Sequence, residues 1–429
     1  MAVEQITNTQ RLKRHVLPCV LMRAGTSKGI FLHQKDLPVN PNDWAPHLIS
    51  ALGSKGNDPR QIDGVGGGTS TTSKVAVVRR SERPDADVDW TFVQVAVGKE
   101  SIDLTGTCGN VTSGVAPFAI QEGLVRPQLG QTKMDIRVYN TNTNRIVVET
   151  VLLNGLGDYE EDGDFIIPGV NTPGSEVKCK FVAPVGSMTG RLFPSKDQQQ
   201  QILRVEPGSL MLGQGPFDVR VTLIDSANPF VLIDTTSIST TLLGTISSDE
   251  ARNALVESIR RAGAVAMGLA TDVESAGRTC GTPKAALVYP PSSMHNIYQN
   301  GSVSSTSQPD IRVQAYSMGL PHPSLQLTGA VTVAVALSYP GTVVADLSTC
   351  GIVPDSPTLP TPEHSPPPDK QTKEEQGYER EVLIQHAKGT IKVGVSIDTD
   401  GGVASCSVSR TARRLFEGKV RYYLQGNAS

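Results

Sequence analysis

Residues 110–125 read NVTSGVAPFAIQEGLV, a segment that is apolar nearly all round and rich in small side chains. A helix without a polar face has to be buried on every side. The segment ends near Gly123, with Pro127 beyond it, as many helices do. Pro117 inside the segment is unfavourable for an unbroken helix. We therefore expect a buried helix within residues 110–125, enclosed by the other elements of the fold.

A second segment of this kind lies late in the chain, at residues 325–337, which read LQLTGAVTVAVAL. The two segments align without a gap, so that TSGVAPFAI from Thr112 lies over LTGAVTVAV from Leu327. Each follows a polar turn containing Gly or Pro and is flanked by β-rich sequence. The pattern predicts an internal repeat, with two β-rich shells each around one buried helix. Chance similarity between two apolar helices is the alternative.

The rest of the chain is dominated by patterns typical of β-strands. Apolar and polar residues alternate, and β-branched residues are frequent, in segments bounded by Gly- and Pro-containing turns. We expect strand, loop and strand at 16–33, a Gly-rich loop leading into a strand at 61–80, and strands at 88–97, 134–153 and 381–397. We expect helices at 42–53 and 249–269, the second with Ser248 and Asp249 as cap residues, and a final helix–strand stretch.

The length of 429 residues exceeds what one hydrophobic core usually holds. The 41 glycines and 29 prolines, with aromatic residues at 5%, are typical of a β-rich protein with many turns. A division within residues 186–215 gives two domains, at 15–200 and 201–429. The proline-rich stretch PDSPTLPTPEHSPPP and the charged residues after it mark 354–380 as a surface insertion of disordered composition.

Composition excludes several classes of protein. The net charge is -3 and no long block of one sign occurs, so the electrostatic footprint of a nucleic-acid-binding protein is missing. No apolar run approaches the roughly 20 residues that a membrane span needs. The six cysteines form no CxxC pair, which argues against a zinc site or a disulfide framework and for reduced thiols in the cytoplasm. The N-terminal segment lacks the apolar core of a signal peptide; a weak organelle-targeting segment is the alternative to a polar tail.

Cys108 is the first candidate for chemistry, because it lies in TGTCGNVTSG directly before the buried helix. A thiol at a helix N-terminus faces unpaired backbone N–H groups, which favour the thiolate. Gly109 lets the backbone approach a ligand closely. An inert buried cysteine is the alternative. The other cysteines lack this setting and are interpreted as structural, with Cys280, in TCGTP, as the next one to examine.

Lys74 is the second candidate, because it follows the glycines and hydroxyls of GGGTSTTSK and begins an apolar strand. A lysine at the edge of an apolar site loses hydration, which lowers its pKa and makes it a usable proton carrier. The alternatives are a lysine that anchors a carboxylate or phosphate, or one that reaches out to water. The loop has neither P-loop spacing nor a following helix, so a nucleotide site is not expected.

Two further segments carry candidate ligand-binding groups. The loop RAGTSKG, which contains Arg23, Thr26, Ser27 and Lys28, suits carboxylate binding; an ordinary polar hairpin turn is the alternative. His322 lies in GLPHPSLQLTG, before the second buried helix.

The repeat alignment indicates which residue of the second half corresponds to Cys108. Pro323 falls opposite Cys108, so the second half has no thiol at the matching place. His322, Ser324 and Thr328 are its nearest polar groups. A lone histidine is often structural, and that is the alternative for His322.

These motifs together resemble the PrpF family of 2-methylaconitate isomerases. The order and spacing match in RAGTSKG at 23, QIDGVGGGTSTTSKVA at 61, CGNVTSGVAPFAI at 108, DSANPFV at 225 and LTGAVTVAVA at 327. The resemblance runs over nearly the whole chain apart from the proline-rich insertion. Fungal aconitate isomerases and bacterial 4-oxalomesaconate tautomerases are similar too.

The resemblance implies an α+β fold of two diaminopimelate-epimerase-like domains. Each would wrap a β-barrel around a central buried helix, with the ligand in the cleft between the domains. The suspected acid and base of the family, a lysine and the cysteine of the first domain, fall on Lys74 and Cys108. True epimerases of this fold carry a cysteine in each domain. The second is missing here, which speaks against epimerisation by two thiols.

We therefore expect a cofactor-independent isomerase that transfers a proton within an aconitate-like unsaturated tricarboxylic acid. A base removes a proton next to a carboxylate, and cations hold the enolate-like charge that develops. Return of a proton then gives double-bond migration or cis–trans exchange. Which of Lys74 and Cys108 is the base stays open. The alternatives are a 4-oxalomesaconate-type keto–enol tautomerase, a non-catalytic polycarboxylate-binding accessory protein and an amino-acid epimerase.

The residues expected to bind the substrate belong to the same motifs. They are Arg23, Thr26, Ser27, Lys28, Gly68, Thr69, Ser70, Gly109, Asn110, Ser226, His322, Thr328 and Gly329. The expected partner is a small polycarboxylate. No metal, organic cofactor, nucleic acid or membrane is expected, and the protein is expected to be a cytoplasmic monomer or homodimer.

Overall fold

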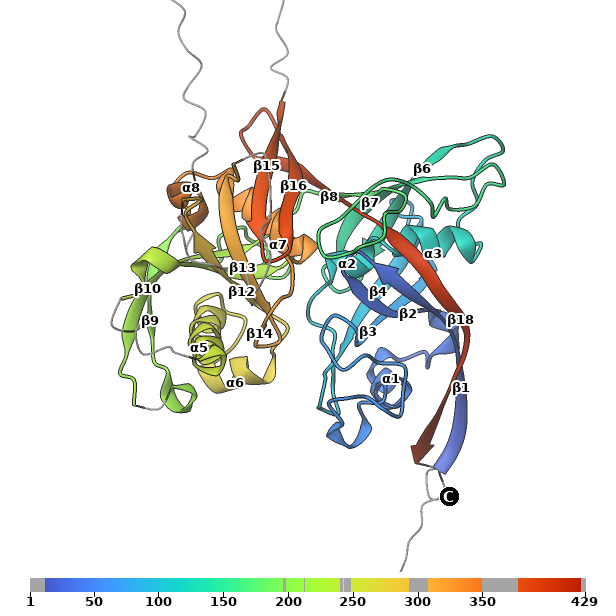
Figure 1. Ribbon diagram of the computed structural model, residues 1–429, viewed down its shortest axis with the longest axis horizontal. Helices are drawn as coiled ribbons and strands as arrows, with labels where there is room; N and C mark the ends of the chain where they lie inside the picture. Colours follow the sequence, from blue (N-terminus) through green and yellow to red (C-terminus); the bar gives the residue numbers. More distant parts are fainter. Residues whose placement is uncertain are drawn as a thin grey trace, which may run out of the picture. The chain divides into compact units, whose positions relative to one another are not determined.

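The computed structural model describes residues 12–195, 198–211, 213–239, 242, 248–292, 308–348 and 377–425. The chain forms two compact units, each built from strands and a smaller number of helices (Figure 1). The first unit comprises the chain up to Ile166, Thr172–Val177, and the chain from Arg410 onward. The second comprises Ile167–Asn171 and Lys178–Ser409.

The described residues of the first unit form a mixed set of parallel and antiparallel strands, with helices packed on it. Its strands are β1 (Leu12–Ala24), β2 (Ser27–His33), β3 (Lys74–Arg80), β4 (Val88–Val95), β5 (Ile102–Asp103), β6 (Lys133–Asn140), β7 (Arg145–Leu152) and β18 (Ala412–Gln425). Its helices are α1 (Trp44–Leu52), α2 (Gly109–Thr112) and α3 (Val115–Gln121). Strands β2 and β3 pair in parallel, as do β4 and β6, whereas β1–β2, β3–β4, β4–β5 and β6–β7 are antiparallel.

The second unit repeats this arrangement. Its strands are β8 (Val177–Val182), β9 (Gln201–Val205), β10 (Phe217–Asp225), β11 (Pro229–Asp234), β12 (Lys284–Tyr289), β13 (Ile311–Ser317), β14 (Leu320–Pro321), β15 (Tyr378–His386), β16 (Gly389–Ile397) and β17 (Val403–Arg410). Its helices are α5 (Asp249–Ala266), α6 (Val273–Arg278), α7 (Leu327–Leu337) and α8 (Val343–Leu347). Strands β11 and β12 pair in parallel, as do β13 and β15, whereas β10–β11, β12–β13, β13–β14 and β15–β16 are antiparallel.

The two units therefore share one succession of strand pairings. A helix, α1 or α5, lies in the crossover that connects the first parallel pair, as is usual for parallel strands. A short strand, β5 or β14, then leads to the apolar helices that the sequence singled out, α2 and α3 or α7. Two unrelated helices would not be expected at the same point of the same strand order. This correspondence supports the internal repeat over chance similarity.

The buried helices differ between the units. All eleven residues of α7 are buried, as expected. The helix expected over residues 110–125 is instead divided into α2 and α3, with Gly114 at the break. A Cβ at Gly114 would lie 2.8 Å from the ring of Phe31, so the chain passes too close to β2 for a side chain. The break also places Pro117 in the first turn of α3, where its missing N–H costs no helical hydrogen bond.

Strand β3 is covered on both faces. Val75 and Val77 belong to a core formed with α1, β1, β2, β4 and β18. Because side chains alternate along a strand, Lys74 and Ala76 face the opposite side, on which α3 packs against β3. The alternation thus directs Lys74 to the side of the sheet that carries α2 and α3.

Other expected elements are found with small shifts at their ends, and three expectations change. The chain passes from the first unit to the second near residues 166–178, not near 200, and returns from Arg410 onward, because β18 pairs along its length with β1 (Figure 1). The final stretch, expected to be a helix and a strand, instead forms two successive strands, β17 and β18. The surface insertion was expected at 354–380. Strand β15 begins within that range, at Tyr378, and residues 354–376 lie outside the described residues.

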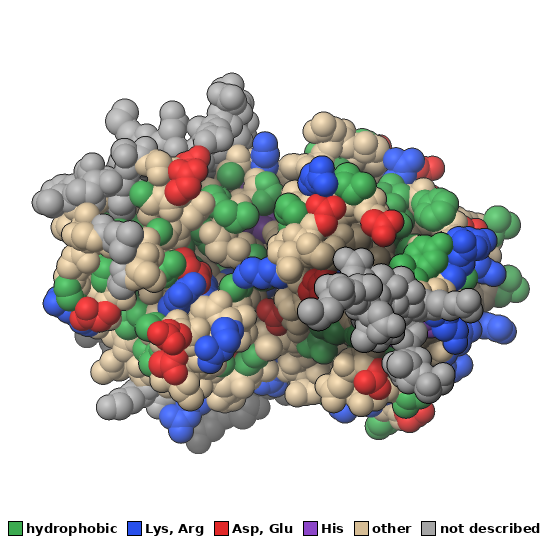
Figure 2. All heavy atoms as spheres, turned by 90° about the horizontal axis from the view of Figure 1, so that it is seen from below, with side chains coloured by type: hydrophobic (Ala, Val, Ile, Leu, Met, Phe, Trp, Pro, Cys, Tyr) green, Lys and Arg blue, Asp and Glu red, His purple; other side chains and the backbone are tan. Residues whose placement is uncertain are grey.

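The surface carries both charge signs. Figure 2 shows basic and acidic side chains distributed over the face in view. Among the described residues, no helix combines the length and apolar character that a membrane span requires.

Glu149 is a buried carboxyl group that caps α3. It projects from β7 with no exposed surface, and its Oε2 accepts a hydrogen bond of 3.0 Å from the backbone N–H of Ala116. Burial raises the pKa of Glu149 well above its ordinary value, against the smaller opposite effect of that hydrogen bond. The folded protein therefore holds this group neutral at pH values where the unfolded chain has lost the proton.

We predict that Glu149→Gln becomes more stable than the wild type as the pH rises. The folded pKa is raised, so the stability that the protonated carboxyl contributes is complete below the unfolded pKa of about 4.3 and is lost as pH rises toward the folded pKa. Glutamine stays neutral, so the difference in free energy of unfolding should grow by at most about 1.4 kcal/mol per pH unit. Denaturant unfolding between pH 5 and 9 measures it. Parallel curves for both proteins would contradict the assignment, and exposed Glu82→Gln is the control.

Candidate active site

Lys74 is held inside the first unit by strand β4. Its side chain is 6% exposed, and its Nζ donates a hydrogen bond of 2.7 Å to Oε1 of Gln94, the residue opposite it in the ladder. The Gln94 amide nitrogen donates in turn to the carbonyl of Ser73 at 2.8 Å, which fixes the direction of the acceptor. The Lys74 Nζ also lies 4.9 Å from the ring centroid of Phe92, within the range of a cation–π contact.

Cys108 lies beside Lys74. It precedes α2 as the N-cap residue and is 8% exposed, and its Sγ is 4.0 Å from Oγ of Ser27. Burial lowers the pKa of Lys74, while the charge of the Cys108 thiolate and a hydrogen bond from Lys74 to it act in the opposite direction, and the net shift is downward. The two leading candidates therefore form one buried amine–thiol pair that can exchange a proton.

Two features lie next to Cys108 that favour a thiolate in proteins: the Lys74 amine and the start of α2. Helix α2 has four residues, so few peptide dipoles are aligned behind Cys108. A neighbouring ammonium favours the thiolate directly. The sequence indicated the helix N-terminus, and the structure adds the Lys74 amine beside Cys108.

The other described cysteines have different surroundings. Burial raises the pKa of Cys19 to about 11 and that of Cys406 to about 12, so both stay protonated near neutral pH. Cys179 is fully buried. Cys280 is half-buried, and its Sγ donates to the carbonyl of Gly277 at 3.2 Å.

The loop after β1 brings polar groups to α2. Gly25, at φ +53°, makes the turn, and Ser27 is buried next to Cys108. Thr26 accepts a hydrogen bond of 3.1 Å from the amide of Asn110, and the backbone N–H of Lys28 donates to the carbonyl of Thr71 at 2.9 Å.

Arg23 makes structural contacts in addition to its expected place in the loop. Its guanidinium donates to the carbonyls of Thr411 at 2.7 Å and Gly25 at 3.2 Å. Burial lowers the pKa of Arg23 from its ordinary value. These contacts show Arg23 tying β1 to the segment before β18, and its place as a substrate-binding residue stays a prediction.

Asn110, directly after Gly109 in α2, is fully buried and is held from two sides. Its Oδ1 accepts a hydrogen bond of 3.0 Å from Nε of Arg410, while its Nδ2 donates to Thr26. Arg410 is 4% exposed and was missed by the sequence reasoning, as were Gln94 and Phe92. Gln94 had a signal, because it is a polar residue in the otherwise apolar stretch FVQVAV. Arg410 had none, since it approaches Asn110 from the far end of the sequence.

The Gly-rich loop before Lys74 folds back on itself. The N–H of Gly68, at φ +70°, donates to the side-chain oxygen of Gln61 at 3.1 Å. The hydroxyl of Thr69 lies 2.6 Å from that of Thr72, and Ser70 is half-buried between them in sequence. The loop is therefore ordered by its own side chains as it leads into β3.

Four predicted residues lie in the second unit. Ser226 donates to the carbonyl of Pro184 at 2.6 Å, and Thr328 accepts a hydrogen bond of 3.3 Å from Asn228. Nδ1 of His322 accepts a hydrogen bond of 3.2 Å from the backbone N–H of Ser324, which is the kind of local contact that the structural alternative implies. A Cβ at Gly329 would lie 3.1 Å from the ring of Phe230, so β11 packs closely on the first turn of α7.

Among the described residues, no group of three or more His, Cys, Asp and Glu side chains could hold a metal ion. The chemistry that the first unit offers is thus that of an amine, a thiol and the hydroxyl and amide groups around them.

Comparison with known proteins places this chain in a family. The model of the family described as PrpF protein matches residues 14–353. The chain belongs to the PrpF family. This confirms the resemblance on which the sequence analysis relied.

Curated relatives of this PrpF-family chain are similar over nearly their whole length. It is 32% identical to a 2-methyl-aconitate isomerase of Shewanella oneidensis, with 93% of this chain and 95% of the relative covered. It is 32% identical to a 3-methylitaconate isomerase of Eubacterium barkeri (94% and 96% covered) and to a (4E)-oxalomesaconate Delta-isomerase of a Novosphingobium species (94% and 96% covered). The relatives are isomerases, and this chain is an isomerase too.

Solved structures agree with that assignment. A methylitaconate-delta-isomerase superposes with a TM-score of 0.66 at 28% identity, over 95% of this chain and 96% of that one. A hydroxyproline epimerase from Agrobacterium vitis superposes with a TM-score of 0.50 at 10% identity, over 96% and 94%, which speaks for the fold alone. The PrpF-family chain thus has an epimerase-like fold with a mixed sheet of many strands.

We predict that Lys74→Met slows alkylation of Cys108 by iodoacetamide at pH 7 by roughly tenfold, because the thiolate loses its neighbouring cation. Peptide mass spectrometry reports the rate at Cys108 separately from that at half-buried Cys280. The exposed first-unit variant Lys133→Met is the matched control. Equal rates in wild type and Lys74→Met would show that the two groups are not coupled.

Proposed function

We propose that this protein is a cofactor-independent isomerase that moves a proton within an aconitate-like unsaturated tricarboxylic acid. The observation that carries the proposal is the buried contact between Lys74 and Cys108. Relatives that are named for methylaconitate, methylitaconate and oxalomesaconate support the class of substrate. All three acids have a carbon–carbon double bond next to carboxylates.

The amine–thiol pair suits proton transfer without a net change in protonation. One group removes a proton from the carbon next to a carboxylate, and the other returns a proton to another carbon, or to the same carbon after bond rotation. The lowered pKa of Lys74 increases the share of neutral amine that can serve as a base. In this order Cys108 is the acid that returns a proton. In the reverse order the Cys108 thiolate is the base and the Lys74 ammonium is the acid. In either order, the two groups together hold the same number of protons after the reaction as before it.

The negative charge that develops on the acid needs donors close by. Ser27 next to Cys108, and Asn110 with Thr26, offer a hydroxyl and an amide on the same side of the first unit. Lys28 follows Ser27 in β2, and its part in binding the acid stays a prediction. Donors held in place by the protein stabilise an enolate-like charge without reorganising during the reaction.

The proposal for the domains and the remaining binding residues is based on the epimerase-like fold. The two units would be the two epimerase-like domains, each with its strands around its own apolar helix, and the second would supply Ser226, His322, Thr328 and Gly329 to substrate binding. The protein would work in the cytoplasm as a monomer or homodimer.

A keto–enol tautomerase of the 4-oxalomesaconate type is the second candidate. The relative named (4E)-oxalomesaconate Delta-isomerase, at the same 32% identity as the methylaconitate and methylitaconate enzymes, supports an oxalomesaconate-type acid as substrate, while its name describes migration of a double bond. The curated relatives are named as isomerases, which argues against the alternative of a non-catalytic binding protein. An amino-acid epimerase remains disfavoured by Pro323, which the repeat aligns with Cys108.

We predict that incubation with aconitate, methylaconitate and oxalomesaconate isomers in D2O, followed by NMR, shows deuterium uptake into one of these acids with formation of its isomer. Migration of a double bond labels the carbon that receives the proton, whereas tautomerisation labels the carbon beside the keto group. Cys108→Ser and Lys74→Ala should each lower kcat by about 10²- to 10⁴-fold, the usual contribution of a general acid or base.

The control is Lys133→Ala, which removes an exposed lysine of the same unit. Circular dichroism establishes that each variant is folded. Full activity in folded Cys108→Ser and Lys74→Ala would refute the assignment of these residues. Uptake of deuterium into none of the acids by the wild type would refute the proposed substrate class.

A further inference from the structure

Gln94 supplies the polar side chain that lies next to Lys74 in the sheet. In the ladder, Lys74 is opposite Gly29 of β2 on one side and opposite Gln94 of β4 on the other. A Cβ at Gly29 would lie 2.5 Å from the carbonyl oxygen of Lys74, so β2 has no room for a side chain there. The cross-strand contact of the amine is therefore made by Gln94, which is 6% exposed.

The direction of the Gln94 amide is fixed by two backbone carbonyls. Its Nε2 donates to the carbonyl of Ser73 at 2.8 Å and to that of Val95 at 3.3 Å. Both carbonyls are held in place, because the Ser73 carbonyl accepts from the N–H of Val95 at 3.1 Å and the Val95 carbonyl accepts from the Ser73 hydroxyl at 2.9 Å. A flipped amide would turn its oxygen toward two carbonyl oxygens. Oε1 is therefore the atom that faces the Nζ of Lys74, at 2.7 Å.

This orientation also fixes one side of the amine. An amide oxygen accepts hydrogen bonds and cannot donate one. Lys74 therefore directs an N–H toward Gln94 both as an ammonium and as a neutral amine. In the neutral amine, the lone pair then lies on another side of the nitrogen, where it can take up a proton. Cys108 is the neighbour that exchanges a proton with this amine.

Gln94 holds the amine without adding a charge. A carboxylate at the same distance would favour the ammonium and raise its pKa, whereas an amide gives a hydrogen bond without a formal charge. Burial lowers the pKa of Lys74, against the opposite effect of Cys108. The amide thus preserves the share of neutral amine that burial creates.

The charged groups on the elements around β3 are directed elsewhere. Helix α3 carries no titratable residue, and burial raises the pKa of Glu149, which caps it. On β2, the alternation turns Lys28 to the other face of the sheet, and His33, at the far end of the strand, pairs with Glu122 at 3.0 Å.

The charged groups near β4 also have partners. Asp89 of β4 forms an ion pair of 2.7 Å with Arg79. Asp103 of β5, opposite Gln94 in the ladder, accepts hydrogen bonds of 2.8 and 2.6 Å from the N–H and the hydroxyl of Thr105. The 3₁₀-helix Gln34–Asp36 follows the end of β2 that is remote from Lys74. Cys108 is thus the described titratable group that acts on Lys74 through its charge.

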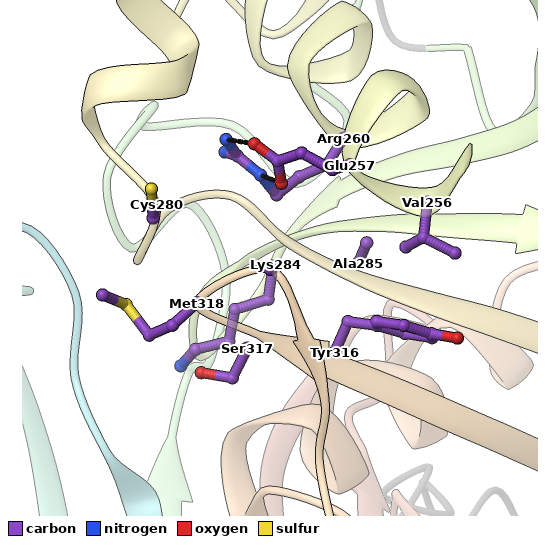
Figure 3. A pocket seen from close by; sticks show the side chains of 10 residues that line it. Val256, Glu257, Arg260, Cys280, Lys284, Ala285, Tyr316, Ser317 and Met318 are labelled. Atoms are coloured by element: carbon purple, nitrogen blue, oxygen red, sulfur yellow. Dashed lines mark hydrogen bonds and ion pairs between the residues drawn. The ribbon is translucent and has the colours of Figure 1, made fainter. Parts of the chain in front are cut away.

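The second unit has a lysine at the same strand position without the glutamine. Lys284 begins β12, the strand that corresponds to β3, and the ladder pairs Ala285 with Tyr316 of β13. Continuing this register by one residue brings Ser317 opposite Lys284. Figure 3 shows the Lys284 side chain directed toward Ser317 and Met318. A long amide beside the lysine is therefore a feature of the unit that contains the amine–thiol pair.

We propose that Gln94 is a positioning residue of the reaction, whose neutral amide oxygen holds one N–H of Lys74 and leaves the rest of the amine free to exchange a proton with Cys108 and the acid. This rests on the proposed function for the reaction itself. Gln94 acts through Lys74 and takes up no proton.

The first test replaces the amide by a carboxylate of the same shape, in Gln94→Glu. The new charge attracts the Lys74 ammonium and repels the Cys108 thiolate, so both groups should release their protons at higher pH. The pH profile of kcat/KM should therefore move upward by about 1 to 3 pH units. Gln128→Glu makes the same change at an exposed glutamine of the first unit and should leave the profile in place. Circular dichroism reports folding.

The second variant, Gln94→Met, keeps the length of the side chain and removes the acceptor. The carbonyls of Ser73 and Val95 each retain a donor, so the change leaves neither without a hydrogen bond. We expect kcat to fall about 10- to 100-fold, the range for loss of a hydrogen bond to a charged group, with little change in KM. An unchanged kcat in folded Gln94→Met would overturn the proposal.

A third measurement needs no substrate. The rate at which iodoacetamide alkylates Cys108, followed against pH by peptide mass spectrometry, should show its midpoint at higher pH in Gln94→Glu than in the wild type. An unmoved midpoint together with an unmoved kcat/KM profile in folded Gln94→Glu overturns the proposal. A moved midpoint in a protein that isomerises none of the acids would support the hold of Gln94 on the pair and refute the proposed function instead.

Discussion

A lysine ammonium kept within an apolar sheet is the constraint on which the candidate site of the first unit depends. Lys74 begins a strand whose next four residues are all buried, and water is largely excluded from its amine. Three neighbours compensate: the amide oxygen of Gln94, the ring face of Phe92 and the sulfur of Cys108. Because Gln94 and Phe92 come from β4, the pairing of β3 with β4 sets the surroundings of the Lys74 amine as well as its position.

Much of this arrangement could be predicted from the sequence, since periodicity reports local structure. The alternation in β4, the amphipathic pattern of α5 and the all-apolar pattern of α7 each identified an element that the structure contains. The motifs around Lys74 and Cys108 identified the pair, because both combine a reactive side chain with glycine and the start of a buried element.

What the sequence could not reveal depends on contacts between distant segments. The break at Gly114 follows from the closeness of Phe31, which no pattern within residues 110–125 records. The hydrogen bonds from Arg23 to the carbonyls of Gly25 and Thr411 likewise depend on the tertiary structure. Arg410 carries no local signal, although it holds the Asn110 side chain in place. The sequence thus shows which side chains are chemically suited to a site. The residues that they contact are determined by the tertiary structure.

The pairing of β1 with β18 has a consequence for synthesis of the chain. Arg23 and Thr411 are 388 residues apart, yet their hydrogen bond joins the two ends of one unit. While the ribosome is still producing the second unit, β1 has no β18 to pair with and Asn110 has no Arg410. The first unit therefore keeps one edge of its sheet uncovered until the ribosome has produced β18, which follows the whole of the second unit, and the contact that holds the Asn110 side chain forms only then.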